Sequence, residues 1–152
     1  RGRIRSKNPE EVIEEVKNLA EQGYKEIVLT GIHLSSYGKD LGDITLLDVI
    51  QRIQQIEDIE RIRLGSLEPR IITEQFVKEL RACDKVCPHF HLSLQSGCDE
   101  TLKRMNRKYT TEEYETALNV LRTYYEHPAL TTDVIAGFAG RQKRSLKNKS
   151  IS

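Results

Sequence analysis

One short stretch in the middle of the chain decides the fold, and it reads Phe90-His91-Leu92-Ser93-Leu94-Gln95-Ser96-Gly97. Its first five residues are mostly apolar, which predicts a buried strand over 90–94. The polar pair and the glycine that follow are typical of the turn at a strand end. Further on, Thr110-Thr111-Glu112-Glu113 forms a capping box, which begins a helix. Strand, polar turn and helix together are the repeating unit of a parallel α/β sheet.

The same unit recurs on both sides of this stretch. Apolar runs predict further strands over 26–31, 61–66 and 130–138, and helices are expected to begin at Pro9, near Thr45 and after Thr73. The strand starts leave room for one crossover helix each, so we expect a parallel sheet. A doubly wound sheet and part of a barrel both fit. No Gly-x-Gly-x-x-Gly follows a strand, which weakens the dinucleotide-binding version of the doubly wound fold.

Composition indicates one globular domain. The 152 residues are 38% hydrophobic and 31% charged, and no apolar run approaches the roughly 18 residues that a membrane span needs. No apolar stretch follows the basic start, so no signal peptide is visible and we expect a cytoplasmic protein without a membrane partner. Three cysteines, an odd number, argue against a disulfide framework.

Charge is distributed unevenly along the chain. Five basic and no acidic residues lie in 139–152, and the remaining residues carry 19 basic and 23 acidic side chains, a net charge of −4. We therefore expect two parts, a folded domain over 1–138 and a basic, disordered tail over 139–152. The tail could bind RNA, but we favour a non-native origin through a cloning artefact or a shifted reading frame. The body lacks the basic footprint of a nucleic-acid-binding domain.

Four predicted strand ends carry polar or glycine-rich groups. They are Thr30-Gly31-Ile32-His33, Gly65-Ser66-Leu67-Glu68, Gln95-Ser96-Gly97 and the segment 133–137. In parallel sheets and barrels, ligands bind where the carboxyl ends of strands meet, and glycines let a ligand approach the backbone. Each end alone is ordinary loop chemistry. Together at one edge they favour a binding site, in which Glu68, Gln95 and Asp133 would hydrogen-bond an amino acid or ribose group.

Two other patterns resemble metal sites. Cys83 and Cys87 lie between a helix and a strand, at the amino edge of the sheet, so structural roles are favoured. His89 and His91 share one strand face, as zinc ligands can, but they stand at the beginning of the strand, away from the edge where barrels bind ligands. We expect no metal ligand and no nucleophilic triad among these residues.

Several motifs together resemble one enzyme family, the radical S-adenosylmethionine tRNA methylthiotransferases. The resemblance covers nearly everything up to Phe138 and rests on Arg1-Gly2-Arg3-Ile4-Arg5-Ser6, Val28-Leu29-Thr30-Gly31-Ile32-His33-Leu34-Ser35-Ser36-Tyr37-Gly38, Leu92-Ser93-Leu94-Gln95-Ser96-Gly97-Cys98-Asp99, Leu102-Lys103-Arg104-Met105-Asn106-Arg107 and Thr132-Asp133-Val134-Ile135-Ala136-Gly137-Phe138. The segment Thr30–Gly38 is similar to the branch that acts on N6-threonylcarbamoyladenosine beside the tRNA anticodon.

The resemblance implies a fold, cofactors and a reaction. The fold would be a partial (β/α) TIM-like barrel with parallel strands and outer helices, truncated at both ends. It implies S-adenosylmethionine and four-iron four-sulfur clusters in the full-length enzyme. Reductive cleavage of the cofactor would yield a 5′-deoxyadenosyl radical that removes hydrogen from adenosine C2, where a methylthio group is installed. The tRNA would be bound through domains absent here.

By motif position, four residues resemble contacts to S-adenosylmethionine. Arg107 would pair with the methionyl carboxylate, Gln95 and Asp133 would hold ribose hydroxyls, and Glu68 would offset the cationic ammonium. The predicted cofactor-binding set is completed from the strand ends and comprises Gly31, His33, Ser66, Glu68, Gln95, Ser96, Arg107 and Asp133. No catalytic residue is predicted.

Two departures from the family pattern matter. The family motif Cys-x-x-x-Cys-x-x-Cys is expected just before Arg1 and is absent from these 152 residues, and Ala139-Gly140-Arg141-Gln142 stands where the family has Pro-Gly-Glu-Thr. We therefore expect this chain alone to bind no cluster and to be inactive. Alternatives are another radical S-adenosylmethionine subclass or a non-enzymatic half-barrel binding domain.

Self-association is also expected. A half barrel has unpaired strand edges, which can pair with another chain. We further expect its inner face to expose Val28, Leu64 or Leu94 as apolar surface that seeks a partner.

Overall fold

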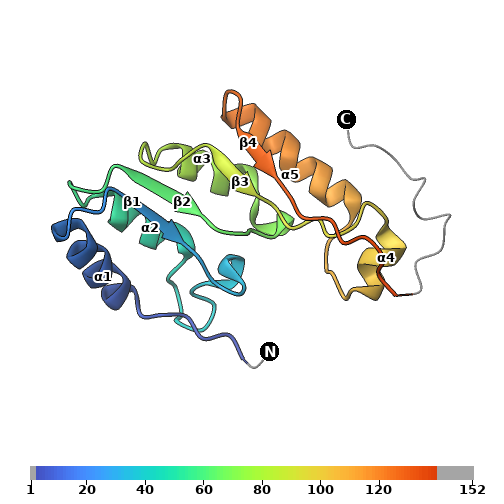
Figure 1. The fold of residues 1–152 in the computed structure, drawn as a ribbon, viewed down its shortest axis with the longest axis horizontal. Helices are drawn as coiled ribbons and strands as arrows, with labels where there is room; N and C mark the ends of the chain where they lie inside the picture. Colours follow the sequence, from blue (N-terminus) through green and yellow to red (C-terminus); the bar gives the residue numbers. More distant parts are fainter. Residues whose placement is uncertain (1–2, 140–152) are drawn as a thin grey trace.

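The computed structural model describes residues 3–139. The tail expected over 139–152 lies outside this range except for Ala139. Helices and strands alternate, as the sequence predicts (Figure 1). In chain order the elements are α1 (Pro9–Glu21), β1 (Glu26–Leu29), α2 (Leu46–Gln54), β2 (Arg61–Leu64), α3 (Glu74–Arg81), β3 (His89–His91), α4 (Asp99–Arg104), α5 (Thr111–Tyr124) and β4 (Ala129–Thr131), with 3₁₀ turns at Leu34–Ser36 and Pro69–Ile71.

Capping residues set where the helices begin. The Asn8 side chain accepts a hydrogen bond from the Glu10 amide, with Pro9 at the first helical position of α1. Thr45 and Thr110 form complete capping boxes at α2 and α5. The helix starts predicted from the sequence are confirmed. Within residues 3–139, no helix is long and apolar enough to cross a bilayer.

All strand pairs are parallel, as predicted. β1 pairs with β2 and β3 with β4, and isolated parallel bridges at Ile62–Val86 and Leu67–Leu92 connect β2 to the β3 segment. The expected single four-stranded sheet is therefore two ladders joined by bridges. Between these two segments, the Ile62 and Leu67 amides donate hydrogen bonds to the carbonyls of Lys85 and His91. The residues between Ile62 and Leu67 form no bridge to the β3 segment, so no continuous ladder joins β2 to β3.

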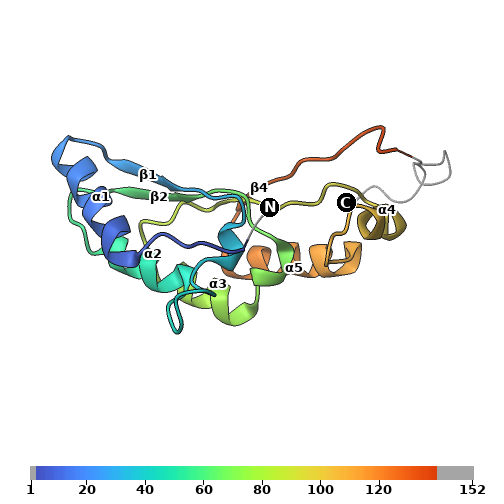
Figure 2. The same cartoon turned by 90° about the horizontal axis from the view of Figure 1, so that it is seen from below.

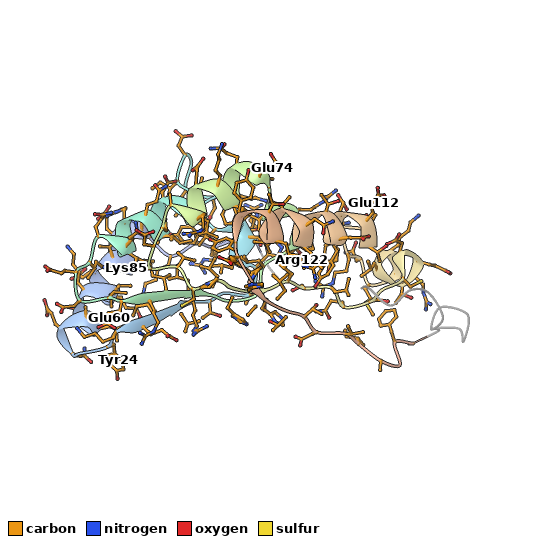
Figure 3. The ribbon with its side chains drawn as sticks, turned by 90° about the horizontal axis from the view of Figure 1, so that it is seen from above. Tyr24, Glu60, Glu74, Lys85, Glu112 and Arg122 are labelled. Carbon is orange, nitrogen blue, oxygen red and sulfur yellow. The ribbon has the colours of Figure 1, made fainter. Side chains whose placement is uncertain are left out.

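Helices cover only one face of the strand layer. Figure 2 shows α2, α3 and α5 on the same side of the strands, and Figure 3 shows side chains on the opposite side with no helix over them. Tyr24, Glu60 and Lys85, labelled in Figure 3, mark the amino ends of the first three strands. The buried core lies between the strands and these helices, and it includes Ile50, Ile53, Ile62, Val77, Leu80, Phe90, Leu92 and Leu121.

The uncovered face differs from the expectation. Leu64 and Leu94 are each only 4% exposed, because they share strand parity with buried Ile62 and Phe90 and so face the helices. Val28, at 55%, is exposed as expected. Charged groups lie beside Val28: the Glu26 carboxylate is 2.8 Å from Nε of both Arg61 and Arg63, and these guanidinium groups lower the pKa of Glu26. The expected exposure of Leu64 and Leu94 is therefore wrong, that of Val28 is confirmed, and self-association stays a prediction.

Candidate cofactor site at the carboxyl edge of the strands

The four strand ends meet along one edge through backbone hydrogen bonds. The Gly65 amide donates to the Leu29 carbonyl (2.7 Å), which joins the ends of β1 and β2. The Leu67 amide donates to the His91 carbonyl (2.9 Å), and the Gln95 amide donates to the Asp133 carbonyl (2.9 Å). The predicted site residues at these ends therefore lie on the same edge, with Gly31 and Ser66 exposed between the loops.

On the β1–β2 side, an imidazole connects two loops. His33 Nε2 lies 3.0 Å from Glu68 Oε1, and His33 Nδ1 shares a hydrogen bond with the Ser36 hydroxyl. The Ser35 hydroxyl accepts from the Glu68 amide at 2.9 Å. The Glu68 side chain is 26% exposed, so its carboxylate is held in place yet remains accessible to a ligand.

On the β3–β4 side, the backbone is strained. Gln95 has φ of 66°, in the left-handed region that side chains other than glycine rarely adopt. It is held there because its amide donates to Asp133 and its carbonyl accepts from the Ile135 amide at 2.9 Å. Such a conformation costs on the order of 1–3 kcal/mol and is concentrated at functional sites. The positive φ at Gln95 is therefore consistent with a functional role for the turn that follows β3.

Two buried polar atoms at this edge have no hydrogen-bond partner within the described part of the chain. They are Ser96 Oγ, in a residue with 0% exposure, and Arg107 Nε. Buried polar groups in native proteins are nearly always paired, and an unpaired one costs roughly 1–3 kcal/mol. Both atoms belong to predicted site residues, and both could be satisfied by a bound ligand.

Tyr109, which the sequence analysis did not single out, lies between the two halves of the edge. Its hydroxyl donates to the Leu94 carbonyl at 3.3 Å, and burial raises its pKa. Both Arg107 and Glu68 act on Tyr109 electrostatically, which places the guanidinium and the carboxylate near the same ring. A tyrosine two residues after the motif arginine is the only sequence signal that could have indicated it.

Asp133 extends the edge toward the uncovered face. Its carboxylate lies 3.4 Å from His91 Nε2, and its side chain is 76% exposed. His91 Nδ1 lies 3.0 Å from the Thr131 hydroxyl, which is also 3.4 Å from His89 Nε2. The two histidines therefore belong to a hydrogen-bonded row across β3 and β4. The expectation that both stand at the beginning of the strand is wrong for His91, because β3 ends at His91, beside the predicted site residue Asp133.

Cys83 and Cys87 lie between α3 and β3, as predicted. Cys83 follows α3, and burial raises the pKa of its thiol. Cys87 precedes β3, and its amide donates to the Ile62 carbonyl. Cys98 stands before α4 on the opposite, carboxyl edge, where hydrogen bonds from Thr101 lower the pKa of its thiol. Among residues 3–139, no three His, Cys, Asp or Glu side chains gather as a metal site, so the described residues do not fit an iron–sulfur cluster.

The same residues do fit a small ligand with a carboxylate, an ammonium group and hydroxyls. Arg107 supplies a cation with an unpaired Nε, Glu68 an accessible carboxylate, and Ser96 an unpaired hydroxyl. Gly97 adds space, because a Cβ built there would meet nothing within 4 Å. The fold is a fragment of a (β/α) barrel, a fold in which ligands bind at the carboxyl ends of the strands.

The chain belongs to the radical S-adenosylmethionine superfamily. The family model described as "Radical SAM superfamily" matches residues 1–148. Curated relatives named tRNA-2-methylthio-N(6)-dimethylallyladenosine synthase include one from Thermoanaerobacter sp. (strain X514), 47% identical over 96% of the chain, and one from Dictyoglomus thermophilum, 42% identical over 96% of it. The chain spans only 31% and 33% of the length of these relatives.

Solved structures agree with the fold. The radical S-adenosylmethionine methyltransferase TsrM from Kitasatospora setae, with cobalamin and a [4Fe-4S] cluster bound, superposes with a TM-score of 0.68 at 19% identity. The match covers 92% of this chain and 27% of that structure. At this identity the likeness concerns the fold alone.

Proposed function

We propose that the complete protein is a tRNA methylthiotransferase that uses S-adenosylmethionine and four-iron four-sulfur clusters to place a methylthio group on C2 of an N6-modified adenosine. The observation that carries this proposal is the 47% identity over 147 residues to a relative that is named for such a reaction. The motif residues from Leu92 to Arg107 and from Thr132 to Phe138 support it, since they form the strand-end site described above.

The described residues would bind and orient the cofactor. The Arg107 guanidinium would pair with the methionyl carboxylate, and Glu68, held by His33, would accept from the ammonium group. Gln95 and Asp133, joined through their backbones, would hold the ribose hydroxyls, and Ser96 Oγ would gain the partner that it lacks. Gly31 and Ser66 would allow close approach between the loops.

The cofactor, once cleaved reductively, supplies the group that removes a hydrogen from the substrate. Because residues 3–139 provide no group of three side chains that could ligate a cluster, this chain alone would position S-adenosylmethionine without activating it. The contribution of the chain is therefore binding and orientation, and we propose that the isolated chain is inactive.

Two substrates are favoured by different observations. Thr30–Gly38 resembles the branch that acts on N6-threonylcarbamoyladenosine, whereas the relatives at 42–47% identity are named for dimethylallyladenosine. Both substrates present the same adenine C2, so the strand-end site serves either. The tRNA itself, a cytoplasmic partner, would be bound mainly through domains beyond this chain.

Nucleoside analysis tests the proposal. The full-length protein, expressed in cells that lack both methylthiotransferases, should restore one 2-methylthio nucleoside in bulk tRNA, measured by mass spectrometry. An Arg107→Met variant should abolish it, whereas Lys108→Met, at an exposed neighbour, should retain it. Accumulation of neither methylthio nucleoside, with the protein folded and cluster-loaded, would refute the function and favour another radical S-adenosylmethionine subclass.

A further inference from the structure

The segment Arg3–Lys7, called here the arm, is fastened to the loop that follows β1. The Ser6 amide and hydroxyl donate to the two Asp40 carboxylate oxygens, at 2.8 Å and 2.5 Å. The Ser6 hydroxyl also accepts from the Gly38 amide at 3.0 Å, and the Tyr37 hydroxyl donates to the Lys7 carbonyl at 2.8 Å. Four hydrogen bonds between residues 30 to 34 positions apart in sequence hold the arm against this loop.

The loop on which the arm rests contains a close backbone contact. Gly38 has φ of 86°, and a Cβ built there would lie 1.8 Å from the Ile44 carbonyl oxygen. The backbone of residues 38 and 44 is therefore in direct contact, which only glycine permits. Gly38 and Ser36 are buried, so the arm packs against an ordered platform.

Three exposed cations lie in the arm and in the loop that it contacts. They are Arg3, Arg5 and Lys39, and within residues 3–139 their charged groups form no ion pair. Lys7 pairs with Glu15, and the Asp40 carboxylate is occupied by Ser6. Over residues 3–8 and 37–43 there are four basic side chains and two acidic ones, Asp40 and Asp43, although the body of the chain is acidic. Arg3, Arg5 and Lys39 are therefore exposed cations beside helix α1, which begins with the acidic residues Glu10 and Glu11.

The arm lies beside the candidate site. Its platform is the loop that begins at the carboxyl end of β1 and also carries His33, the partner of Glu68. In Figure 1 the dark blue arm runs along this loop, on the side to which the arrow of β1 points. A polyanion bound along the arm would pass the edge where the cofactor is expected.

We propose that Arg3, Arg5 and Lys39 form a surface that binds the phosphates of the RNA backbone. Hydrogen bonds of the arm with Asp40 and Tyr37 fix the position of this surface. This inference rests on the proposed function, because it assigns part of the tRNA contact to this chain. Exposed cations neutralise phosphates independently of sequence, and a fixed backbone sets their spacing. Asp40, although negative, would favour RNA binding by holding the arm.

Binding of an anticodon stem–loop RNA to the 152-residue chain tests the surface. Fluorescence anisotropy at about 50 and 200 mM salt should show weaker binding for Arg5→Gln and Lys39→Gln than for the parent chain. For each contact removed, the loss of affinity between these salt concentrations should shrink by about threefold. Lys78→Gln, which removes an exposed cation from α3, should leave both quantities unchanged, and the basic residues after 139 are common to all variants. Equal effects of all three variants, or no binding at about 50 mM salt, would overturn the proposal.

The hydrogen bonds that join Asp40 and Tyr37 to the arm, called here the clamp, allow a sharper test. Asp40→Ala removes a negative charge, so charge alone predicts tighter RNA binding, whereas loss of the clamp predicts weaker binding and faster trypsin cleavage after Arg5. Tyr37→Phe, which changes no charge, should shift both readouts in the same direction. Tighter binding by Asp40→Ala would overturn the proposal. The proposed function would fail separately, through the absence of the methylthio nucleoside in an otherwise RNA-binding protein.

Discussion

His33 Nε2 lies 3.0 Å from Glu68 Oε1, and this contact joins the loops that follow the first two strands. Ser36 holds the other ring nitrogen, so the imidazole has a fixed orientation. The Glu68 carboxylate is therefore oriented before any ligand arrives, and ligand binding need not immobilise it. Pre-organisation of this kind raises affinity because less conformational entropy is lost on binding.

Removal of this imidazole should weaken cofactor binding. In the full-length protein, His33→Ala should raise the dissociation constant for S-adenosylmethionine by at least about tenfold, because a hydrogen bond to a charged group contributes roughly 1.5–3 kcal/mol. Equilibrium dialysis checks this. If His33 acts through Glu68, the double variant with Glu68→Gln should bind no more weakly than Glu68→Gln alone. Additive losses would show that the two side chains act independently.

Ser96 and Ser36 are both buried, but only the Ser36 hydroxyl has a hydrogen-bond partner, so the two residues can be compared as test and control. Ser96→Ala should leave the free energy of unfolding of this chain unchanged or raise it by about 1 kcal/mol, because it removes an unpaired buried hydroxyl. Ser36→Ala should lower it by about 1 kcal/mol, because it removes a made contact to His33. Urea denaturation measures both. Equal destabilisation by the two variants would mean that Ser96 Oγ is paired in solution.

Low pH should open the arm. Hydrogen bonds from the Ser6 hydroxyl and amide lower the pKa of Asp40. The carboxylate therefore stabilises the clamp above the ordinary aspartate pKa of about 3.9, and this stabilisation is lost as pH falls through the lowered value. In NMR spectra, the amide chemical shifts of Ser6 and Gly38 should change together with pH, with a midpoint below about pH 3.9. The amide chemical shift of the core residue Ile53 should not change. A midpoint above that value would contradict the clamp.

Anaerobic reconstitution should give no stoichiometric cluster on this chain. Cys83 and Cys87 lie by the amino ends of the strands and Cys98 at the carboxyl edge, so three thiolates do not converge. Absorbance after treatment with iron and sulfide, and an assay for 5′-deoxyadenosine with dithionite, should both stay at background. The full-length protein, treated in parallel, should become coloured. One cluster per 152-residue chain would overturn the placement of the cysteines.

Local signals in the sequence predicted most of the helices and strands, but they could not predict contacts between residues far apart in the sequence. Asn8-Pro9 and the Thr110 capping box fix helix starts by local hydrogen bonds, and both were readable. The short helix α4 was missed because six residues with one buried apolar side chain, Leu102, show no period. The facing of Leu64 was misjudged because barrel strands are buried on both sides when complete. The alternation Arg61-Ile62-Arg63-Leu64 in fact indicates a polar inner face.

The strand-end set could be proposed because parallel strands bring their carboxyl ends to one edge. The hydrogen-bond partners of these residues could not be predicted from the sequence. His33 meets Glu68, and Ser6 meets Asp40, only through the path of the loop after β1, and the strain at Gln95 depends on pairing with Asp133. These contacts span 34 to 38 residues of sequence and have no local signature.

The most direct measurement is a crystal structure of the full-length protein with S-adenosylmethionine bound. We predict that the cofactor lies across the carboxyl ends of β1 to β4, with its carboxylate on Arg107, its ammonium group near Glu68 and a hydrogen bond to Ser96 Oγ. Electron density for the cofactor at the amino ends of the strands, near Cys83 and Cys87, or away from these side chains, would contradict the site and the roles assigned to its residues.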